Sequence, residues 1–333
     1  MMLHQIVIFL LLCVTVPFVV GTLAGKSTLS DRYEQKIEIR LKQLNKPAVK
    51  SVHVCECPEN TIPIRRTTRD DLLRSDSIEN YGRKSPPTIF HHDGAQTQEV
   101  HEHACVQVDH GRFHGSKSRI SIWKPNVLTT REFSLAQTWV VNGERVTGLN
   151  TLESGWQSDT YGETGCYNLD CPGFVQVNRD ISLGAALNTF STYNGDQYDF
   201  ELTIQKDPYT GLWWLIFETQ LVGYWPSSIV PKLAHSARKI AWGGEIVYYA
   251  RGGGTHTHTQ MGSGHFAENG FKKAAYINNL KFINTYNNPI SPFPQSLEAT
   301  VTRPECYNLR IGSSQRWGTY IFYGGPGRNP QCL

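Results

Sequence analysis

Apolar and polar residues alternate along most of the chain after about His101, and this period of two is the pattern of half-buried β-strands. The clearest case is residues 198–205, where one face would carry Tyr198, Phe200, Leu202 and Ile204. A turn at residues 206–211 separates this segment from an apolar, aromatic run at residues 212–217. Together the two segments predict a β-hairpin whose second strand is buried on both faces.

Similar segments predict several more strands, joined by Gly-rich turns. They lie at residues 119–123, 133–141, 245–250, 275–282 and 319–323. Residues 227–240 are expected to form a helix that lies across the sheets. Many short strands of this kind are typical of an all-β fold, and we expect an antiparallel β-sandwich.

The first third of the chain has a different pattern. Residues 31–44 place apolar side chains at helical spacing, and residues 67–81 predict a second short helix with acidic residues in its first turn. Residues 85–98 are polar and contain proline and histidine, as expected of a linker that is cleaved. The apolar run at residues 6–20 predicts a secretory signal peptide, and no later segment could span a bilayer.

Charge and cysteine content narrow the function classes. The net charge is only +3 and the basic residues are scattered, so nucleic acid is not an expected partner. Eight cysteines agree with export. Cys13 would leave with the signal peptide. The spacing of the others favours the disulfides Cys166–Cys171 and Cys306–Cys332 and leaves Cys55, Cys57 and Cys105 unassigned. The spacing does not match a zinc site, and we expect no metal or cofactor.

Two glutamates lie in unusual settings. Glu153 stands in Thr-Leu-Glu-Ser-Gly-Trp and Glu245 in Trp-Gly-Gly-Glu-Ile-Val, so each carboxylate has glycine and an indole nearby. Such surroundings exclude water and favour the protonated acid. If the fold brings the two acids together, the pair could share one proton, so that the ionised member activates water and the protonated member hydrogen-bonds the scissile carbonyl. The alternative is that each acid only pairs with a lysine or caps a turn.

Other polar residues are weaker candidates. His256 and His258 would share a strand face, but their spacing matches no HExxH pattern, and hydrogen bonding is favoured over zinc binding for them, as it is for His101 and His103. Ser263 lies between glycines without the G-x-S-x-G elbow of serine hydrolases. The residues expected to line a substrate groove, because they flank the acids or lie in a Gly-rich turn, are Trp156, Trp242 and Gln260.

Several long motifs carry a resemblance to one family. They are LKQLNKP, CPENTIPIRRT, GCYNL, VGYWP, WGGE, TQMGSGHF and YGGPGRNP. On these motifs the chain, from about Leu41 to its C-terminus, resembles the neprosin family of secreted plant proteins, which includes a glutamic prolyl endopeptidase. The family's catalytic glutamates fall in I/L-E-x-G-W and W-G-G-E motifs, which match Glu153 and Glu245.

The resemblance implies an organisation and an activity. A signal peptide would occupy residues 1–24, an activation propeptide residues 25–94 and a β-sandwich peptidase domain residues 95–333. The expected product is a monomer secreted to the apoplast, without membrane contact after signal cleavage. Its expected partners are its own propeptide and proline-containing peptides, which it would cleave after proline at acidic pH.

One stretch departs from the family pattern. Members carry an additional segment with an aromatic strand between the Gly-Trp-Gln and Thr-Gly-Cys-Tyr blocks, whereas here residues 155–157 lead almost directly into residues 164–166. A strand's length of chain is therefore missing beside Glu153. Two hypotheses follow: a secreted glutamic peptidase made as a zymogen, or a catalytically inactive secreted module of the same fold that binds cell-wall polymer or peptide.

Overall fold

The computed structural model describes residues 29–45, 57, 60–74, 78–79, 81, 98–129, 132–144, 148–159, 168–169, 173–250 and 254–333. The expected signal peptide, nearly all of the expected linker and the expected Cys166–Cys171 bridge lie outside these residues. The expected Cys306–Cys332 disulfide is confirmed, while Cys57 and Cys105 are free thiols. Among the described residues, no helix is both long and apolar enough to cross a membrane.

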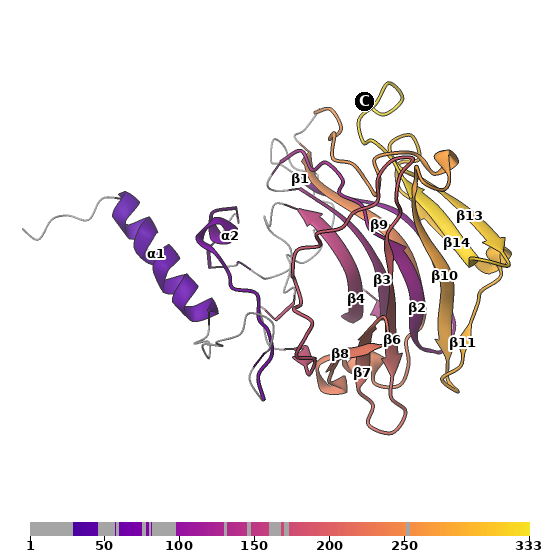
Figure 1. The fold of residues 1–333 in the computed structure, drawn as a ribbon, viewed down its shortest axis with the longest axis horizontal. Coiled ribbons are helices and arrows are strands. Elements are labelled where there is room, and N and C mark those ends of the chain that lie inside the picture. The colour runs from indigo at the N-terminus through magenta and orange to yellow at the C-terminus, as the bar shows by residue number, and fades with distance from the viewer. Residues whose placement is uncertain are drawn as a thin grey trace, which may run out of the picture.

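Two antiparallel sheets form the body of the protein, as predicted (Figure 1). The first sheet has the order β12-β1-β9-β3-β4. Its strands are β1 (Gln98–Val108), β3 (Phe133–Glu144), β4 (Gly148–Asp159), β9 (Lys239–Ala250) and β12 (Glu298–Val301).

The second sheet has the order β13-β14-β10-β2-β6-β7-β8-β5, and β11 pairs with β10. Its strands are β2 (Phe113–Ser121), β5 (Val175–Gln176), β6 (Asp199–Lys206), β7 (Trp213–Phe217), β8 (Gln220–Trp225), β10 (Ala275–Asn284), β11 (Pro289–Ile290), β13 (Asn308–Ser314) and β14 (Gly318–Gly324).

The main hydrophobic core fills the space between the two sheets. The predicted hairpin is confirmed as β6 and β7, and Phe200, Leu202 and Ile204 point into this core; the expectation that β7 is buried on both faces is wrong, because only its alternate residues Trp213 and Leu215 are buried. Trp213 and Trp242 are fully buried there, and the indole N–H of Trp242 donates a hydrogen bond of 2.8 Å to Ser116 Oγ across the core. Because the strands alternate, the opposite face of each sheet is left for other functions.

The expected helix at residues 227–240 is wrong. Two short 3₁₀ turns, η1 (Ser227–Ile229) and η2 (Pro231–Leu233), are followed after five residues by β9. Pro231, inside this segment, has no backbone N–H to donate, so an α-helical hydrogen-bond ladder cannot run through it. Two further 3₁₀ turns, η3 (Ala267–Asn269) and η4 (Pro294–Ser296), lie in later loops.

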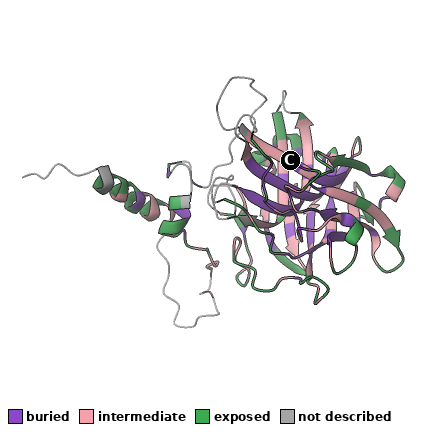
Figure 2. Cartoon of the chain, turned by 90° about the horizontal axis from the view of Figure 1, so that it is seen from above, coloured by how far each residue is buried: buried purple, intermediate pink, exposed green. Residues whose placement is uncertain are grey.

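Two helices precede the sheets and stand apart from them (Figures 1 and 2). They are α1 (Leu29–Leu44) and α2 (Arg69–Arg74), so the second helix is shorter than the predicted residues 67–81. Their contact has a small core of its own, formed by Ile37, Leu72, Ile78 and Tyr81. A core of this size contributes little stability, so hydrogen bonds and ion pairs carry a large share of it.

Candidate active site

The two candidate glutamates lie on one face of the first sheet. Glu245 on β9 is in register with Leu135 of β3, and Glu153 on β4 is in register with Trp139 of the same strand. Positions 135 and 139 of β3 share a face, and its alternate residue Ala136 belongs to the core between the sheets. Both carboxylates are therefore directed away from the second sheet, onto what we call the outer face.

The register also sets how far apart the two acids are. They flank β3 on opposite sides and lie four positions apart along it, which corresponds to roughly 16 Å between their Cα atoms. Sharing one proton would need carboxylate oxygens about 3 Å apart, and this spacing does not provide that by itself. The arrangement instead suits a substrate that lies diagonally across β3, with one acid near each side of the scissile bond.

Gln137 occupies the position of β3 midway between the two acids. Its strand neighbours are Gly155 on β4 and Gly243 on β9, so no side chain stands on either side of it. A Cβ at Gly155 would lie 1.9 Å from the carbonyl oxygen of Ala136, so this position needs glycine for the close approach of the strands. We call this row of Gly155, Gln137 and Gly243 the glycine strip; Gly155 is exposed, whereas Gln137 and Gly243 are buried.

Glu153 is held by uncharged donors. Thr151 Oγ1 donates a hydrogen bond of 2.8 Å to Glu153 Oε1, and Gln137 Nε2 donates one of 3.0 Å to Glu153 Oε2. Thr151 lies two residues earlier on β4, and residues with this spacing share a strand face. These contacts orient the carboxyl group toward β3.

Glu245 is held by histidine. His101 Nδ1 lies 2.5 Å from Glu245 Oε1, and His103 Nε2 lies 3.6 Å from the same oxygen. The other ring nitrogen of His101 lies 2.9 Å from Glu99 Oε1. Burial lowers the pKa of His101, but its hydrogen bonds and charge attraction to Glu245 and Glu99 outweigh burial and raise this pKa to about 9. His101 is therefore an imidazolium throughout the acidic and neutral range.

An apolar cluster adjoins Glu245 on the outer face. Phe133, Leu135 and Val247 are buried there and pack with Trp139. The Glu245 side chain is only 10% exposed. Low water access of this kind strengthens the charge interactions of a carboxylate.

The expected groove residues take other positions. The expectation that Trp242 lines a groove is wrong. Trp242 lies three residues before Glu245 on β9, so the alternation of the strand turns its indole into the core and away from the outer face. Gln260 accepts a hydrogen bond of 3.0 Å from the backbone N–H of Asn126 and fixes a loop. The backbone of Trp156 pairs with Ala136, and its side chain is outside the described part of the chain.

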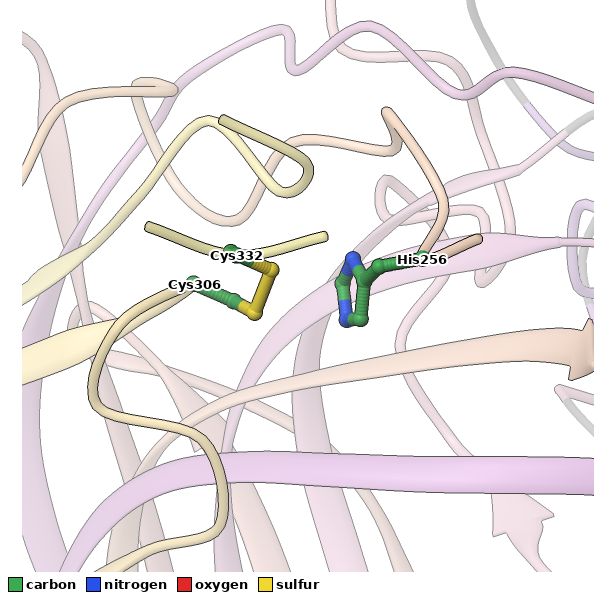
Figure 3. Close-up of side chains that lie close together, drawn as sticks. All are labelled: His256, Cys306 and Cys332. Carbon is green, nitrogen blue, oxygen red and sulfur yellow. A yellow bond between two sulfur atoms is a disulfide. The ribbon is translucent and has the colours of Figure 1, made fainter. Parts of the chain in front are cut away.

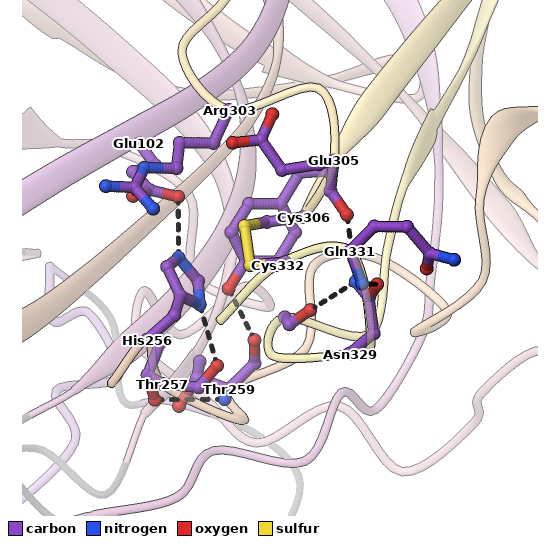
Figure 4. Close-up of a disulfide and its surroundings, with 12 residues drawn as sticks. Glu102, His256, Thr257, Thr259, Arg303, Glu305, Cys306, Asn329, Gln331 and Cys332 are labelled. Atoms are coloured by element: carbon purple, nitrogen blue, oxygen red, sulfur yellow. Dashed lines mark hydrogen bonds and ion pairs between the residues drawn. A yellow bond between two sulfur atoms is a disulfide. The ribbon is translucent and has the colours of Figure 1, made fainter.

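His256 is part of a buried polar cluster (Figure 4). Its Nε2 lies 2.9 Å from Glu102 Oε2, and its Nδ1 lies 2.8 Å from the carbonyl oxygen of Thr257. Tyr248 also donates its hydroxyl to Glu102, at 3.1 Å. The cluster ties β1 and β9 to the segment around residue 256.

The donor atoms of His256, Cys306 and Cys332 lie within 4.8 Å of one another, a spacing that would also suit a metal ion (Figure 3). The two sulfur atoms are joined in the disulfide, and both ring nitrogens of His256 have hydrogen-bond partners. With its donors engaged in this way, the group serves as structural support.

The sequence alone singled out His101 but did not connect it with either glutamate. It did not identify Gln137 or Glu99 as neighbours of the two acids. The alternation of residues 99–103 places Glu99, His101 and His103 on one strand face, which is a usable signal. The pairing of that strand with the one carrying Glu245 is a contact between segments 144 residues apart, and the sequence pattern does not specify it.

Comparison with protein families agrees with this architecture. The model of the neprosin family matches residues 154–326, and the model of the neprosin activation peptide matches residues 26–107. The first match runs from within β4, just after Glu153, to just past β14, so β1, β2 and β3 lie before it. The second covers both helices and nearly all of β1, including Glu99, His101 and His103.

Proposed function

Since the chain belongs to the neprosin family, we propose that it is a secreted endopeptidase, made with an activation peptide, that hydrolyses peptide bonds after proline at acidic pH. The observation that carries the proposal is the placement of Glu153 and Glu245 on one face of one sheet, on either side of the row in which Gln137 lies between Gly155 and Gly243. A peptide chain can lie close to the backbone along this strip, within reach of both carboxyl groups.

The proposed reaction is a direct attack of water on the scissile carbonyl. One glutamate is ionised and takes a proton from the attacking water, which forms the bond to the carbonyl carbon. The other glutamate is protonated and hydrogen-bonds the carbonyl oxygen as negative charge develops there. When the tetrahedral intermediate collapses, the C–N bond breaks and the amine leaves with a proton supplied by the acid residue.

Two features of the activation peptide support a zymogen whose activation peptide is released at acidic pH. Its helices rest on a small core and on an Asp71 carboxylate that is almost fully buried. Protonation of such carboxylates at low pH removes interactions that hold the folded form. Release to the apoplast remains part of the proposal and rests on the expected signal peptide at residues 1–24.

The test uses the full chain, incubated at acidic pH with a fluorogenic peptide that carries proline before the scissile bond. Glu153→Gln and Glu245→Gln each keep the size of the side chain and remove its acid function, so each is expected to lower the rate to background. The matched control is Glu305→Gln, which changes an exposed glutamate on a loop and leaves the rate unchanged. Full turnover by either active-site variant would exclude the dyad.

A second candidate, the inactive binding module, is favoured by the position of Glu153. β4 ends the order of the first sheet among the described strands, and it is the strand beside which family members carry additional chain. This candidate predicts retention on a peptide or cell-wall polymer column and no turnover from pH 3 to pH 8, a range of about five units around the carboxylate and histidine pKa values.

Serine or zinc hydrolysis is tested with serine reagents and chelators, neither of which should inhibit the proposed enzyme.

A further inference from the structure

His101 lies between two carboxylates on the outer face of the first sheet. Its Nδ1 is 2.5 Å from Glu245 Oε1, and its Nε2 is 2.9 Å from Glu99 Oε1. A carboxylate oxygen only accepts, so both ring nitrogens satisfy these contacts best when both carry a proton. Tyr249 donates its hydroxyl to the other oxygen of Glu99, at 3.3 Å, and so fixes Glu99 in its turn.

The two candidate catalytic acids thus have partners of different charge. Glu245 faces an imidazolium, and an opposite charge this close favours the ionised carboxylate. The contacts of Glu153 with Thr151 and Gln137 are with uncharged groups. A base that is to work in acid must stay ionised where an ordinary glutamate becomes protonated, and the contact of Glu245 with His101 provides this.

We propose that His101 is a positioning residue that, clamped by Glu99, holds Glu245 ionised and oriented, so that Glu245 takes the proton from water and Glu153 acts as the acid. The proposal rests on the proposed peptidase function and specifies which glutamate has which role. His101 does not touch the substrate in this scheme, because its ring nitrogens are both engaged with carboxylates.

A second histidine, His103, also faces Glu245, at a longer distance than His101. His103 is in register with Glu245 but lies at 3.6 Å, and its nitrogen is a weaker contact than that of His101. Burial, followed by the negative charge of Glu245, raises the pKa of the Cys105 thiol to about 12, so this neighbour is neutral. On β3 the residue in register with Glu245 is the apolar Leu135, and on β4 the residue in register with Leu135 is the uncharged Gln157. Glu99 and Tyr249 complete the set from β1 and β9.

The first experiment measures His101 directly in the full chain, without reference to activity. Proton–carbon NMR of histidine-labelled protein, with His101→Gln to assign the signal, should give a titration midpoint of about 9. In Glu245→Gln and in Glu99→Gln the midpoint should fall toward the ordinary value of 6.5, because each variant removes one carboxylate partner. A midpoint that is unchanged in Glu245→Gln would overturn the pairing.

The second experiment is the pH–rate profile of the acid-incubated full chain on the proline peptide. In His101→Gln the acidic limb, where the base becomes protonated, should move up by about one to two pH units, because the imidazolium charge is lost. Glu99→Gln should move the limb in the same direction by less. The matched control is His235→Gln, which changes an exposed histidine outside both sheets and leaves the profile in place.

The outcomes distinguish a failure of the proposed role of His101 from a failure of the proposed peptidase mechanism. An acidic limb that stays in place in both His101→Gln and Glu99→Gln rules out the positioning role, even if the dyad is correct. Full activity of Glu245→Gln would instead remove the proposed peptidase mechanism, while the NMR titration would still report whether His101 and Glu245 are paired. A general loss of activity at all pH values without a shift of the limb would indicate a merely structural role and would also overturn the proposal.

Discussion

Gln137 donates a hydrogen bond of 3.0 Å to Glu153 from the position of β3 that lies midway between Glu153 and Glu245. The carboxamide has a second N–H, and the neighbouring strand positions are the glycines Gly155 and Gly243. Gln137 is therefore placed to orient Glu153 and to offer a donor to a carbonyl oxygen bound over the glycine strip.

Replacement of Gln137 tests this placement. Gln137→Ala removes a donor directed at the site and is expected to lower kcat/KM by about 10²–10³, the usual loss for one donor to a developing oxyanion. The measurement is steady-state hydrolysis of the proline peptide at the acidic optimum. Gln107→Ala, on β1 of the same sheet, is the control and should keep the activity of the unaltered protein. A Gln137→Ala enzyme with unchanged kcat/KM would show that this amide has no part in the reaction.

The strands and their faces could be predicted from the sequence because they follow from local alternation. Glu245, Val247 and Tyr249 share one face of β9, as the period of two requires. The same rule places Trp242 on the opposite face once β9 is seen to begin at Lys239 instead of Glu245. The error about Trp242 was therefore an error about where the strand begins.

The neighbours of the acids could not be predicted, because they depend on strand order. His101 reaches Glu245 only because β1 lies next to β9, and Gln137 reaches Glu153 only because β3 lies next to β4. Such pairings join segments far apart in the chain, and the hydrophobic pattern of each strand is compatible with several orders. The four-position offset between Glu153 and Glu245 could not be predicted either, because it depends on the register of β3 with β4 and β9.

Asp71 makes the stability of the activation peptide sensitive to acid. Burial raises the pKa of this carboxyl, but the hydrogen bonds of Arg65 and Thr68 outweigh burial, and the net shift lowers the pKa from 3.8. Thr68 and Asp71 also form the reciprocal bonds of a helix N-terminal box, with Thr68 N–H donating at 2.7 Å and Asp71 N–H donating at 3.2 Å. A group whose pKa is lowered in the folded form stabilises that form above the unfolded value and ceases to do so as pH falls.

The α1–α2 unit should therefore loosen as pH falls below about 3.8, through the lowered pKa of Asp71 in the folded form. Asp71→Asn should weaken the unit at neutral pH as well, because the ion pair with Arg65 is lost. Amide hydrogen exchange of residues 29–45 and 69–74 measures this, with the exposed Asp70→Asn as the matched control. Equal protection of these amides at pH 3 and pH 7 would contradict the prediction.

β1 must remain with the sheets after activation. It pairs along its whole length with β9 and on its other side with β12, so it lies inside the first sheet, although the activation-peptide match extends to residue 107. Removing an internal strand exposes the unpaired edges of both neighbours. We expect the N-terminus of the acid-activated protein to lie before Gln98.

Two measurements check this boundary. Mass spectrometry of the acid-activated protein gives its new N-terminus directly. A chain that begins at Gln98 should give soluble protein with a β-rich circular dichroism spectrum, whereas one that begins at Asp109 should aggregate. An active product that starts after Val108 would show that the sheet tolerates the loss of β1.

Glu102 should be among the most sensitive positions for stability. It lies on β1 on the side opposite His101, and its almost fully buried carboxylate binds His256 at 2.9 Å and Tyr248 at 3.1 Å, with Arg303 Nε at 3.6 Å. Glu102→Ala leaves the His256 nitrogen and the Tyr248 hydroxyl buried without their acceptor, so we expect a loss of about 3–5 kcal/mol in the free energy of unfolding. Glu102→Gln keeps an acceptor oxygen and should lose less stability.

Denaturant unfolding monitored by tryptophan fluorescence gives the free energy of unfolding of both variants, with exposed Glu305→Ala as the control. A loss below about 1 kcal/mol in Glu102→Ala, within the range of ordinary surface changes, would mean that the cluster relaxes without cost.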